Sequence, residues 1–179
     1  MSKVFWAGGL ICLVLALGLF VGCSDDEGTI TPPAMDPAGS IAVYTDIAGT
    51  DNNIVDNGTF ITLYVVHRVP DGSLGCQFRV EAPTGWTELG TQTKFPVTLG
   101  VPATGVSVGY GSCQYDAIHV LSVTYTAPGD TPAGATFKIL PVVYPPAQGG
   151  GQADYVEVVD CNSNLLFTVD AMESPVTVP

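Results

Sequence analysis

The sequence predicts an all-β domain folded as an antiparallel β-sandwich, and three observations lead to this prediction. Glycine and proline are frequent, with 21 and 14 residues in a chain of 179, whereas lysine and glutamate, which favour helix surfaces, are scarce. Valine, threonine and tyrosine are abundant, as in half-buried strands. From Ile41 onward, short apolar runs alternate with turn residues, and no stretch is long and periodic enough for a crossover helix. We therefore expect about eight or nine strands in two layers.

Residues 1–22 form the one predicted helical segment, a signal peptide. Lys3 supplies a positive charge, and a long apolar run closes with Phe20-Val21-Gly22-Cys23. That ending resembles a bacterial lipobox, and the resemblance implies cleavage before Cys23 and lipidation of that cysteine. Two alternatives stay open. One is an uncleaved transmembrane helix, which needs about 20 apolar residues. The other is an ordinary secretory signal that ends at Ala16-Leu17-Gly18.

Residues 23–40 are expected to form the lipidated cysteine and a disordered tether. This stretch has three prolines and few apolar residues, so it cannot support a packed core. The sandwich domain is expected to cover residues 41–179. With the implied lipid anchor, the domain is exported and held on the cell membrane or the outer membrane, outside the cytoplasm.

The predicted strands follow in order from Ile41. The first covers residues 41–45, and a polar segment separates it from the second. Pro70-Asp71-Gly72-Ser73 is a strong turn signal, so residues 59–82 are expected to form a β-hairpin. Further strands are expected at five segments: 105–109, 117–126, 135–143, 155–159 and 165–170.

A family resemblance can be stated for part of this domain. The segment Leu74-Gly75-Cys76-Gln77-Phe78-Arg79-Val80-Glu81, followed by Pro83-Thr84-Gly85-Trp86, resembles the early strands of cohesin-like and carbohydrate-binding-like sandwiches. The stretch from Ile118 to Lys138 is similar to their penultimate hairpin. The resemblance implies an exported sandwich of Ig-like or jelly-roll-like type. It includes no motif that assigns a binding residue.

Three cysteines remain in the exported domain: Cys76, Cys113 and Cys161. An exported compartment permits disulfides, and three thiols allow one bridge. Strand alternation places Cys76 on an inward face, where it acts as a small buried hydrophobe. Cys113 and Cys161 both lie in turn-like sequence, so we predict a Cys113–Cys161 disulfide. A Cys76–Cys113 bridge remains the alternative.

The exported part is strongly acidic. Loss of Lys3 with the signal leaves four basic residues against 17 acidic ones. A nucleic-acid ligand is excluded, because its binding needs basic surface to displace counterions from phosphates. An acidic surface keeps an exported domain soluble without any specific partner.

Three aromatic residues are candidates for ligand binding. Trp86, with Tyr110 or Tyr115 nearby, can stack on a sugar only if it is exposed to solvent. In the alternative interpretation, Trp86 covers the core. Exposure of these rings would favour a carbohydrate-binding module.

The polar segment from Asp46 to Gly58 is the candidate metal site. Calcium takes oxygen ligands, and Asp46, Asp51, Asn53 and Asp56 supply them here without EF-hand spacing. Alternatively, these residues form Asx turns. No other cofactor is expected, since the chain has no CxxC pair and only two histidines.

The two histidines are the other chemically reactive side chains. Alternation along the strands places His67 with Val65 and His119 with Leu121. We expect both to lie at strand ends with satisfied polar tips rather than to form a catalytic pair.

Catalysis is not expected. The chain has no G-x-S-x-G elbow. Glu81 and Glu88 flank Trp86, and a glycosidase needs such a pair across a cleft, but a solvated strand edge explains them as well. The predicted function is therefore a non-catalytic binding or structural role in the cell envelope, towards a protein or a polysaccharide. A carbohydrate-binding module and an envelope hydrolase are the alternatives.

Overall fold

The computed structural model describes residues 39–144, 151–153, 155–162, 165–168 and 170–179. The predicted signal peptide, Cys23 and nearly all of the predicted tether lie outside these residues. Within the described ranges all regular structure is β-strand, so the all-β prediction is confirmed. None of these residues belongs to a helix with the length and apolar character to span a membrane.

The strands are β1 (Ser40–Tyr44), β2 (Ile54–Val55), β3 (Phe60–Glu81), β4 (Thr87–Gln92), β5 (Val97–Val101), β6 (Gly105–Thr126), β7 (Thr136–Leu140), β8 (Val143–Tyr144), β9 (Gly151–Gln152), β10 (Glu157–Asp160), β11 (Leu165–Thr168), β12 (Asp170–Ala171) and β13 (Ser174–Thr177).

Two long strands, β3 and β6, form the centre of the domain. They pair antiparallel from Phe60 opposite Thr126 to Phe78 opposite Val106. The separately predicted strands 105–109 and 117–126 are therefore parts of one strand. Alternate residues of β3 and β6 face the core, as expected for strands of a sandwich.

The predicted hairpin over residues 59–82 is wrong. Both of its halves pair with β6, and Pro70-Asp71-Gly72-Ser73 makes a bulge inside β3, where the register with β6 shifts between Val69 and Ser73. The turn-forming residues still serve a purpose, because Gly72 adopts φ of 82° and Asp116 on β6 adopts φ of 65°. The bulge takes up the extra residues without reversing the chain.

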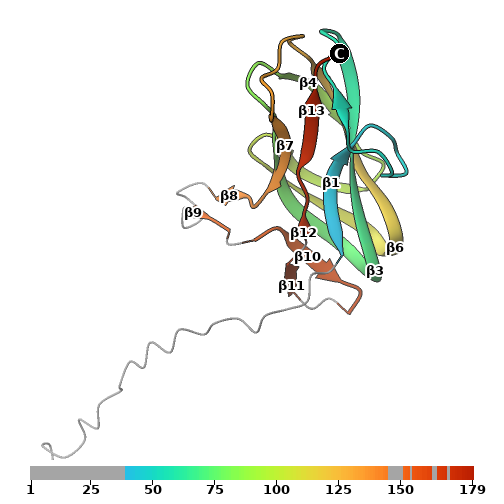
Figure 1. Cartoon of the computed structure of the whole chain (residues 1–179). Coiled ribbons are helices and arrows are strands. Elements are labelled where there is room, and N and C mark those ends of the chain that lie inside the picture. The colour runs from blue at the N-terminus through green and yellow to red at the C-terminus, as the bar shows by residue number, and fades with distance from the viewer. Residues whose placement is uncertain (1–38, 145–150, 154, 163–164, 169) are drawn as a thin grey trace, which may run out of the picture. The chain divides into compact units, whose positions relative to one another are not determined.

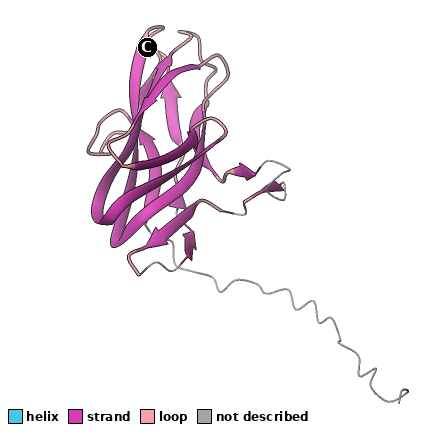
Figure 2. Ribbon diagram, turned by 180° about the vertical axis from the view of Figure 1, so that it is seen from behind, coloured by secondary structure: helices cyan, strands magenta, loops and turns pink. Residues whose placement is uncertain are grey.

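The two halves of each long strand belong to different layers of the sandwich. Before the bulge, β3 pairs with β1 and β6 pairs with β4, while β12 extends this layer beyond β1. After the bulge, β3 pairs with β10 and β7, β6 pairs with β5, and β11 lies beyond β10. The ladder therefore runs through eleven strands, folded into two layers (Figures 1 and 2). Pairing is antiparallel except for β1 with β12 and β2 with β13.

The core lies between the layers and confirms the predicted sandwich. Its fully buried side chains come from both halves of the long strands and from β1, β2 and β7, and include Phe78, Phe137, Ile41, Ile54, Leu63 and Leu121. Trp86 packs edge-on against Phe137 and Tyr125, with ring centroids 4.9 and 6.2 Å away. Burial of these apolar side chains is the main force that holds the layers together.

Strands β4, β5 and β13 were not predicted. β4 and β5 each pair with β6 and with no other described strand, so they form sheet edges. Edge strands carry exposed polar or small residues, and the run Thr87–Gln92 has no inward apolar alternation that would mark it.

Candidate functional site

Strands β5, β6, β3 and β10 lie side by side in one layer, and their outer face contains hollows. We call this surface the β5–β10 face. Its outward residues on β6 are Gly105, Ser107 and Gly109, because Val106 and Val108 between them point into the core. Because these outward residues are small, the surface in the middle of this sheet is recessed. Gly75 of β3 lies directly opposite Gly109, which continues the low floor across to the next strand.

Apolar side chains stand along one border of this floor. On β5, Val97, Leu99 and Val101 are 51, 67 and 52% exposed, and they share the outward face because they alternate with Thr98 and Gly100. We call these three side chains, together with the half-exposed Val143 before Tyr144, the apolar rim. Sequence reasoning missed them, although the alternation in Val97–Val101 was the signal that could have found them.

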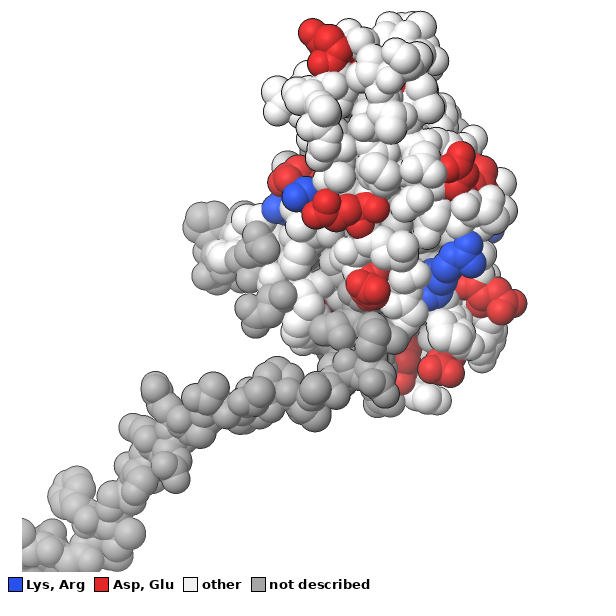
Figure 3. Space-filling view, in the orientation of Figure 1, with Lys and Arg blue, Asp and Glu red and all other residues white. Residues whose placement is uncertain are grey.

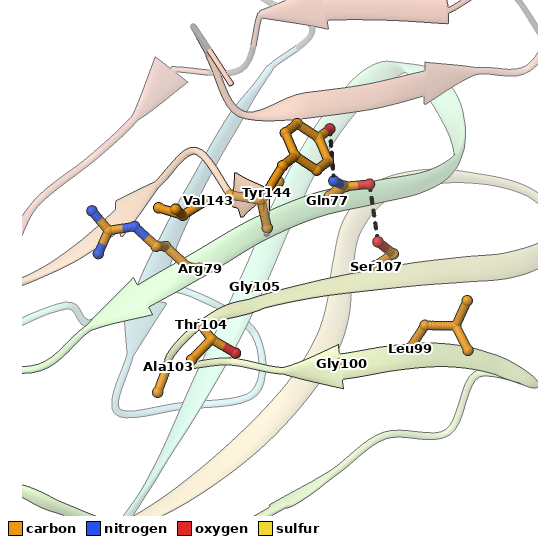
Figure 4. Close-up of a pocket in the computed structure, with 11 residues that line it drawn as sticks. Gln77, Arg79, Leu99, Gly100, Ala103, Thr104, Gly105, Ser107, Val143 and Tyr144 are labelled. Atoms are coloured by element: carbon orange, nitrogen blue, oxygen red, sulfur yellow. Dashed lines mark hydrogen bonds between the residues drawn. The ribbon is translucent and has the colours of Figure 1, made fainter. Parts of the chain in front are cut away.

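Two open hollows lie on the β5–β10 face. The larger has a volume of about 850 Å³ and extends from Leu99 to Arg79 and Tyr144. The smaller, of about 260 Å³, lies between Val97 and Val159. Gln77 and Ser107 line both hollows, so the two hollows adjoin on the sheet, and we call them together the depression. Figure 4 shows Leu99 and Arg79 at opposite sides of the larger hollow.

A chain of hydrogen bonds crosses the depression from strand to strand. Ser107 Oγ donates to Gln77 Oε1 at 2.9 Å, and Gln77 Nε2 donates to the Tyr144 hydroxyl at 3.0 Å (Figure 4). The Tyr144 hydroxyl in turn donates to Glu157 Oε2 at 3.2 Å. Burial and the nearby Glu157 carboxylate raise the pKa of Tyr144, so it remains a donor at neutral pH. The network fixes the orientation of the amide in the middle of the face.

Charges are sparse on the β5–β10 face. Arg79 is neutralised by Glu81, with 3.2 Å between Nη1 and Oε2, and its Nε donates to the Pro141 carbonyl at 3.2 Å. Over the side of the domain that Figure 3 shows, acidic side chains are scattered among wide uncharged areas and do not gather into one patch. Acidity is therefore a general property of the surface visible there.

Two of the three candidate ligand-binding aromatic residues do not meet the condition of exposure. Trp86 and Tyr110 are buried, with 8% and 4% of their surface exposed, and the Trp86 indole N–H donates to Thr131 Oγ1 at 2.8 Å. Trp86 thus covers the core, as the alternative interpretation had it. Tyr115 is exposed, but it lies beside the disulfide rather than next to another exposed ring of the set. A sugar cannot stack on buried rings.

The predicted disulfide is present. It joins Cys113 of β6 to Cys161, the residue that follows β10, with 5.3 Å between their Cα atoms. Cys76 is a buried free thiol, as predicted. The Tyr110 hydroxyl donates to Cys76 Sγ at 3.1 Å and is hydrogen-bonded to His67 Nδ1 at 3.0 Å. These three groups form a polar cluster inside the core.

The histidines lie on neighbouring strands but on opposite sides of their layer. His67 faces the core, whereas His119 faces outward, where its Nε2 is 2.9 Å from Ser122 Oγ. The expected shared face of His119 and Leu121 is wrong, because the register shifts beside Val66 and both Val120 and Leu121 turn inward. The two imidazoles therefore do not meet.

Two of the predicted calcium ligands instead stabilise a turn. The Asp46 carboxylate accepts hydrogen bonds from the backbone N–H groups of Ala48, Thr50 and Asp51 at 2.7–2.9 Å. Asp51 accepts one from the N–H of Asn53 at 3.0 Å. These are the Asx turns of the alternative interpretation.

Asp56 lies apart from that turn and is fully buried. Its carboxylate accepts hydrogen bonds from the backbone N–H groups of Gly58, Gly129 and Thr131, and a short one from the Thr131 hydroxyl. Burial raises the pKa of Asp56, but hydrogen bonds from Thr131, Gly58 and Gly129 outweigh this effect and hold it below its ordinary value. Over the residues that the structure describes, no three histidine, cysteine or acidic side chains are arranged to hold a metal ion.

Glu81 and Glu88, the candidate carboxylate pair, have separate partners. Glu81 forms the ion pair with Arg79, and Glu88 accepts a hydrogen bond from Thr91 Oγ1 at 2.9 Å within β4. Each carboxylate therefore has its partner on its own strand.

Comparisons with known proteins return structural neighbours only. No protein-family model matches the sequence, and no curated protein is found as a relative. Among solved structures, a cohesin module of a family 33 glycoside hydrolase from Clostridium perfringens is similar, with 8% identity over 80% of this chain and all of that one, at a TM-score of 0.49.

Two further structural neighbours are also cohesins. A type I cohesin from Pseudobacteroides cellulosolvens shares 12% identity over 79% of this chain and 93% of that one, at a TM-score of 0.47. A non-cellulosomal cohesin from Archaeoglobus fulgidus shares 10% identity over 77% and 90%, also at 0.47. At these scores the three matches describe a likeness of fold alone.

Proposed function

We propose that this chain is a lipid-anchored domain of the cell envelope that binds a protein partner, without catalysis, through the β5–β10 face. The observation that carries the proposal is the apolar rim. Three β5 side chains are each more than half exposed, and two of them, Val97 and Leu99, line the hollows, where glycines and polar side chains form the floor. Exposed apolar groups around a hollow are typical of a surface that a partner covers.

The chemistry of the face favours a protein over a polysaccharide. Sugar rings are held by exposed aromatic faces, but Trp86 and Tyr110 are inside the core. Tyr144, which lines the larger hollow, is partly buried and its hydroxyl is bonded to Gln77 and Glu157. Aliphatic side chains such as Leu99 and Val97 bury well against aliphatic or aromatic side chains of another protein. The Gln77 amide and the Ser107 hydroxyl supply oriented polar contacts at the centre of the apolar rim.

The proposed lipid anchor rests on the N-terminal sequence. Cys23 at the end of the apolar run would carry lipid, and residues 24–40 would separate the domain from the bilayer. Metabolic labelling with a fatty-acid analogue tests this part: the wild-type chain takes up label, and Cys23→Ala does not. Equal labelling of both chains would contradict the anchor.

The binding proposal is tested by affinity capture with a matched pair of variants. Leu99 and Leu89 are both exposed leucines on edge strands, but only Leu99 lies on the β5–β10 face. Purified full-length protein is exposed to envelope proteins of the source organism, and bound partners are identified and titrated. Leu99→Lys is expected to weaken binding by about tenfold or more, since it places a charge in an apolar contact, whereas Leu89→Lys retains wild-type affinity.

Two further experiments test the polysaccharide and calcium alternatives. In the first, envelope polysaccharide replaces the protein fraction. In the second, each titration is repeated with calcium and with a chelator. Retention of polysaccharide, or equal loss of binding in both leucine variants, would contradict the proposed protein site. Binding that depends on calcium would support the Asp46–Asp56 segment as a metal site.

A further inference from the structure

The disulfide attaches the outermost element of the β5–β10 face to the centre of the sandwich. Cys113 belongs to β6, and Cys161 follows Asp160, the last residue of β10. The two cysteines are 48 residues apart in sequence. The bridge therefore acts on the end of β10 and on the turn beyond it.

β10 is a short strand. Its four residues pair with β3, with a register shift after Val159, and its other edge pairs with β11, which is equally short. The Ser73 hydroxyl adds one bond to the Val159 carbonyl at 2.9 Å. By contrast, β3 and β6 pair along almost their whole length. Loss of the bridge should thus affect β10 far more than the central strands, because local stability follows the number of local contacts.

β10 supplies part of the binding surface. Glu157 and Val159 line the smaller hollow, and Glu157 accepts the hydrogen bond that holds Tyr144. Val158, between them, is fully buried and fixes the strand to the core. A displacement of β10 would therefore alter both the border of the face and its hydrogen-bond chain.

Both cysteines of the bridge lie partly at the surface, and the free thiol among the described residues is enclosed in the core. Cys113 and Cys161 are half-buried at the surface, and exposed Tyr115 lies beside them. Gly72 covers the sulfurs so closely that a Cβ there would be 2.6 Å from Cys161 Sγ. Cys76 is enclosed in the core, and burial raises its pKa to about 12, so little attacking thiolate forms at neutral pH.

We propose that the Cys113–Cys161 disulfide is a redox-sensitive clamp on the β10 edge of the β5–β10 face. A dithiol reductant passes two electrons to the bridge, the S–S bond breaks, each sulfur takes a proton, and the dithiol closes to its own disulfide. Reduction then loosens β10 and weakens partner binding, while the sandwich stays folded. The effect on binding rests on the proposed function, whereas the loosening of β10 does not.

Hydrogen exchange of the full-length protein, oxidised and reduced, tests the clamp. We expect the amides of Val158 and Val159 to exchange about tenfold faster or more after reduction, whereas those of Leu63 and Val123 in the central strands are unchanged. Cys113→Ser/Cys161→Ser should reproduce the reduced pattern without reductant, and Cys76→Ser should retain the oxidised one.

Three results would overturn the proposal. One is unchanged exchange in β10, and another is equal acceleration in the central strands. The third is a shift of Trp86 emission on reduction, which would show that the bridge stabilises the whole fold.

In the capture assay, reduction is expected to weaken binding at least about fivefold. Full binding by the reduced protein would contradict the proposed effect of the bridge on partner binding. If oxidised wild-type protein captures no partner, the proposed function fails, and the exchange data alone still decide the clamp.

Discussion

Asp56 ties two loops together through one buried carboxylate. Its oxygens accept hydrogen bonds from Gly58, Gly129 and Thr131, and Thr131 also receives the Trp86 indole N–H. We expect Asp56→Asn to lower the free energy of unfolding by about 2–4 kcal/mol, because an amide N–H₂ would face donors that then lack an acceptor. Urea unfolding followed by tryptophan emission measures this loss, with Asp51→Asn as the exposed control. Equal stability of wild type and Asp56→Asn would contradict the role of Asp56.

Low pH should remove the stabilisation that the Asp56 carboxylate provides. The pKa of Asp56 is held below its ordinary value of 3.8, so folding favours the deprotonated carboxylate. Its stabilisation is complete above about pH 4 and declines as the pH falls through the folded pKa. The difference in unfolding free energy between wild type and Asp56→Asn should therefore narrow as the pH falls below about 4. If this difference in unfolding free energy increased at lower pH, the prediction would be contradicted.

Cys76 should be chemically silent in the folded protein. It is buried, and its pKa is raised to about 12 by burial, which outweighs the hydrogen bond from Tyr110. Alkylation followed by peptide mass spectrometry should find Cys76 unmodified in native protein at about pH 8 and modified in denaturant, since the thiolate is the reactive form. Fast native labelling would show that the core is open around β3.

At the scale of elements, the β5–β6 hairpin forms one wall of the larger hollow. Gly105 adopts φ of 142°, and a Cβ there would lie 2.0 Å from Val142 Cγ1. Gly105→Ala is expected to lower the free energy of unfolding by about 1–3 kcal/mol through strain and overpacking. Gly90→Ala on β4, where an added Cβ meets nothing within 4 Å, is the matched control and should be near neutral. Thermal unfolding compares the two, and equal melting temperatures would contradict this account of the hairpin.

The sequence analysis succeeded where local pattern and composition decide the outcome. The all-β class, the inward Cys76 and the Cys113–Cys161 bridge are all confirmed. It failed where pairing between strands that are far apart in the sequence decides the structure. Pro70–Ser73 has the chemistry of a turn, but pairing of both flanks with β6 makes it a bulge. Trp86 could not be assigned to core or surface from its neighbours in sequence, because its burial depends on Phe137 and Tyr125.

The candidate site was missed for a similar reason. The apolar alternation of Val97–Val101 is short and interrupted by Gly100, so it gave no strand prediction. Its importance comes from the small outward residues of β6 beside it, and only the register of β5 on β6 brings them together. A depression between three strands is a property of tertiary pairing.

At the scale of the whole molecule, the account combines an acidic domain, a sparsely charged face and a proposed anchor. Formal net charge is −12 at pH 7, so the domain is repelled by anionic membrane surfaces. A tether of the predicted kind would let such a domain stay clear of the bilayer while it meets a partner. The binding energy would come from the sparsely charged β5–β10 face, and binding should therefore depend only weakly on salt.

Hydroxyl-radical footprinting of the full-length protein, alone and with its captured partner, tests the central claim most directly. The account predicts that the side chains of Val97, Leu99 and Val143 become protected on binding, whereas exposed Phe60 and Leu89, which lie on the other layer, keep their reactivity. Protection of Phe60 and Leu89 with unchanged oxidation of the apolar rim would contradict it, since the partner would then bind the opposite side of the sandwich.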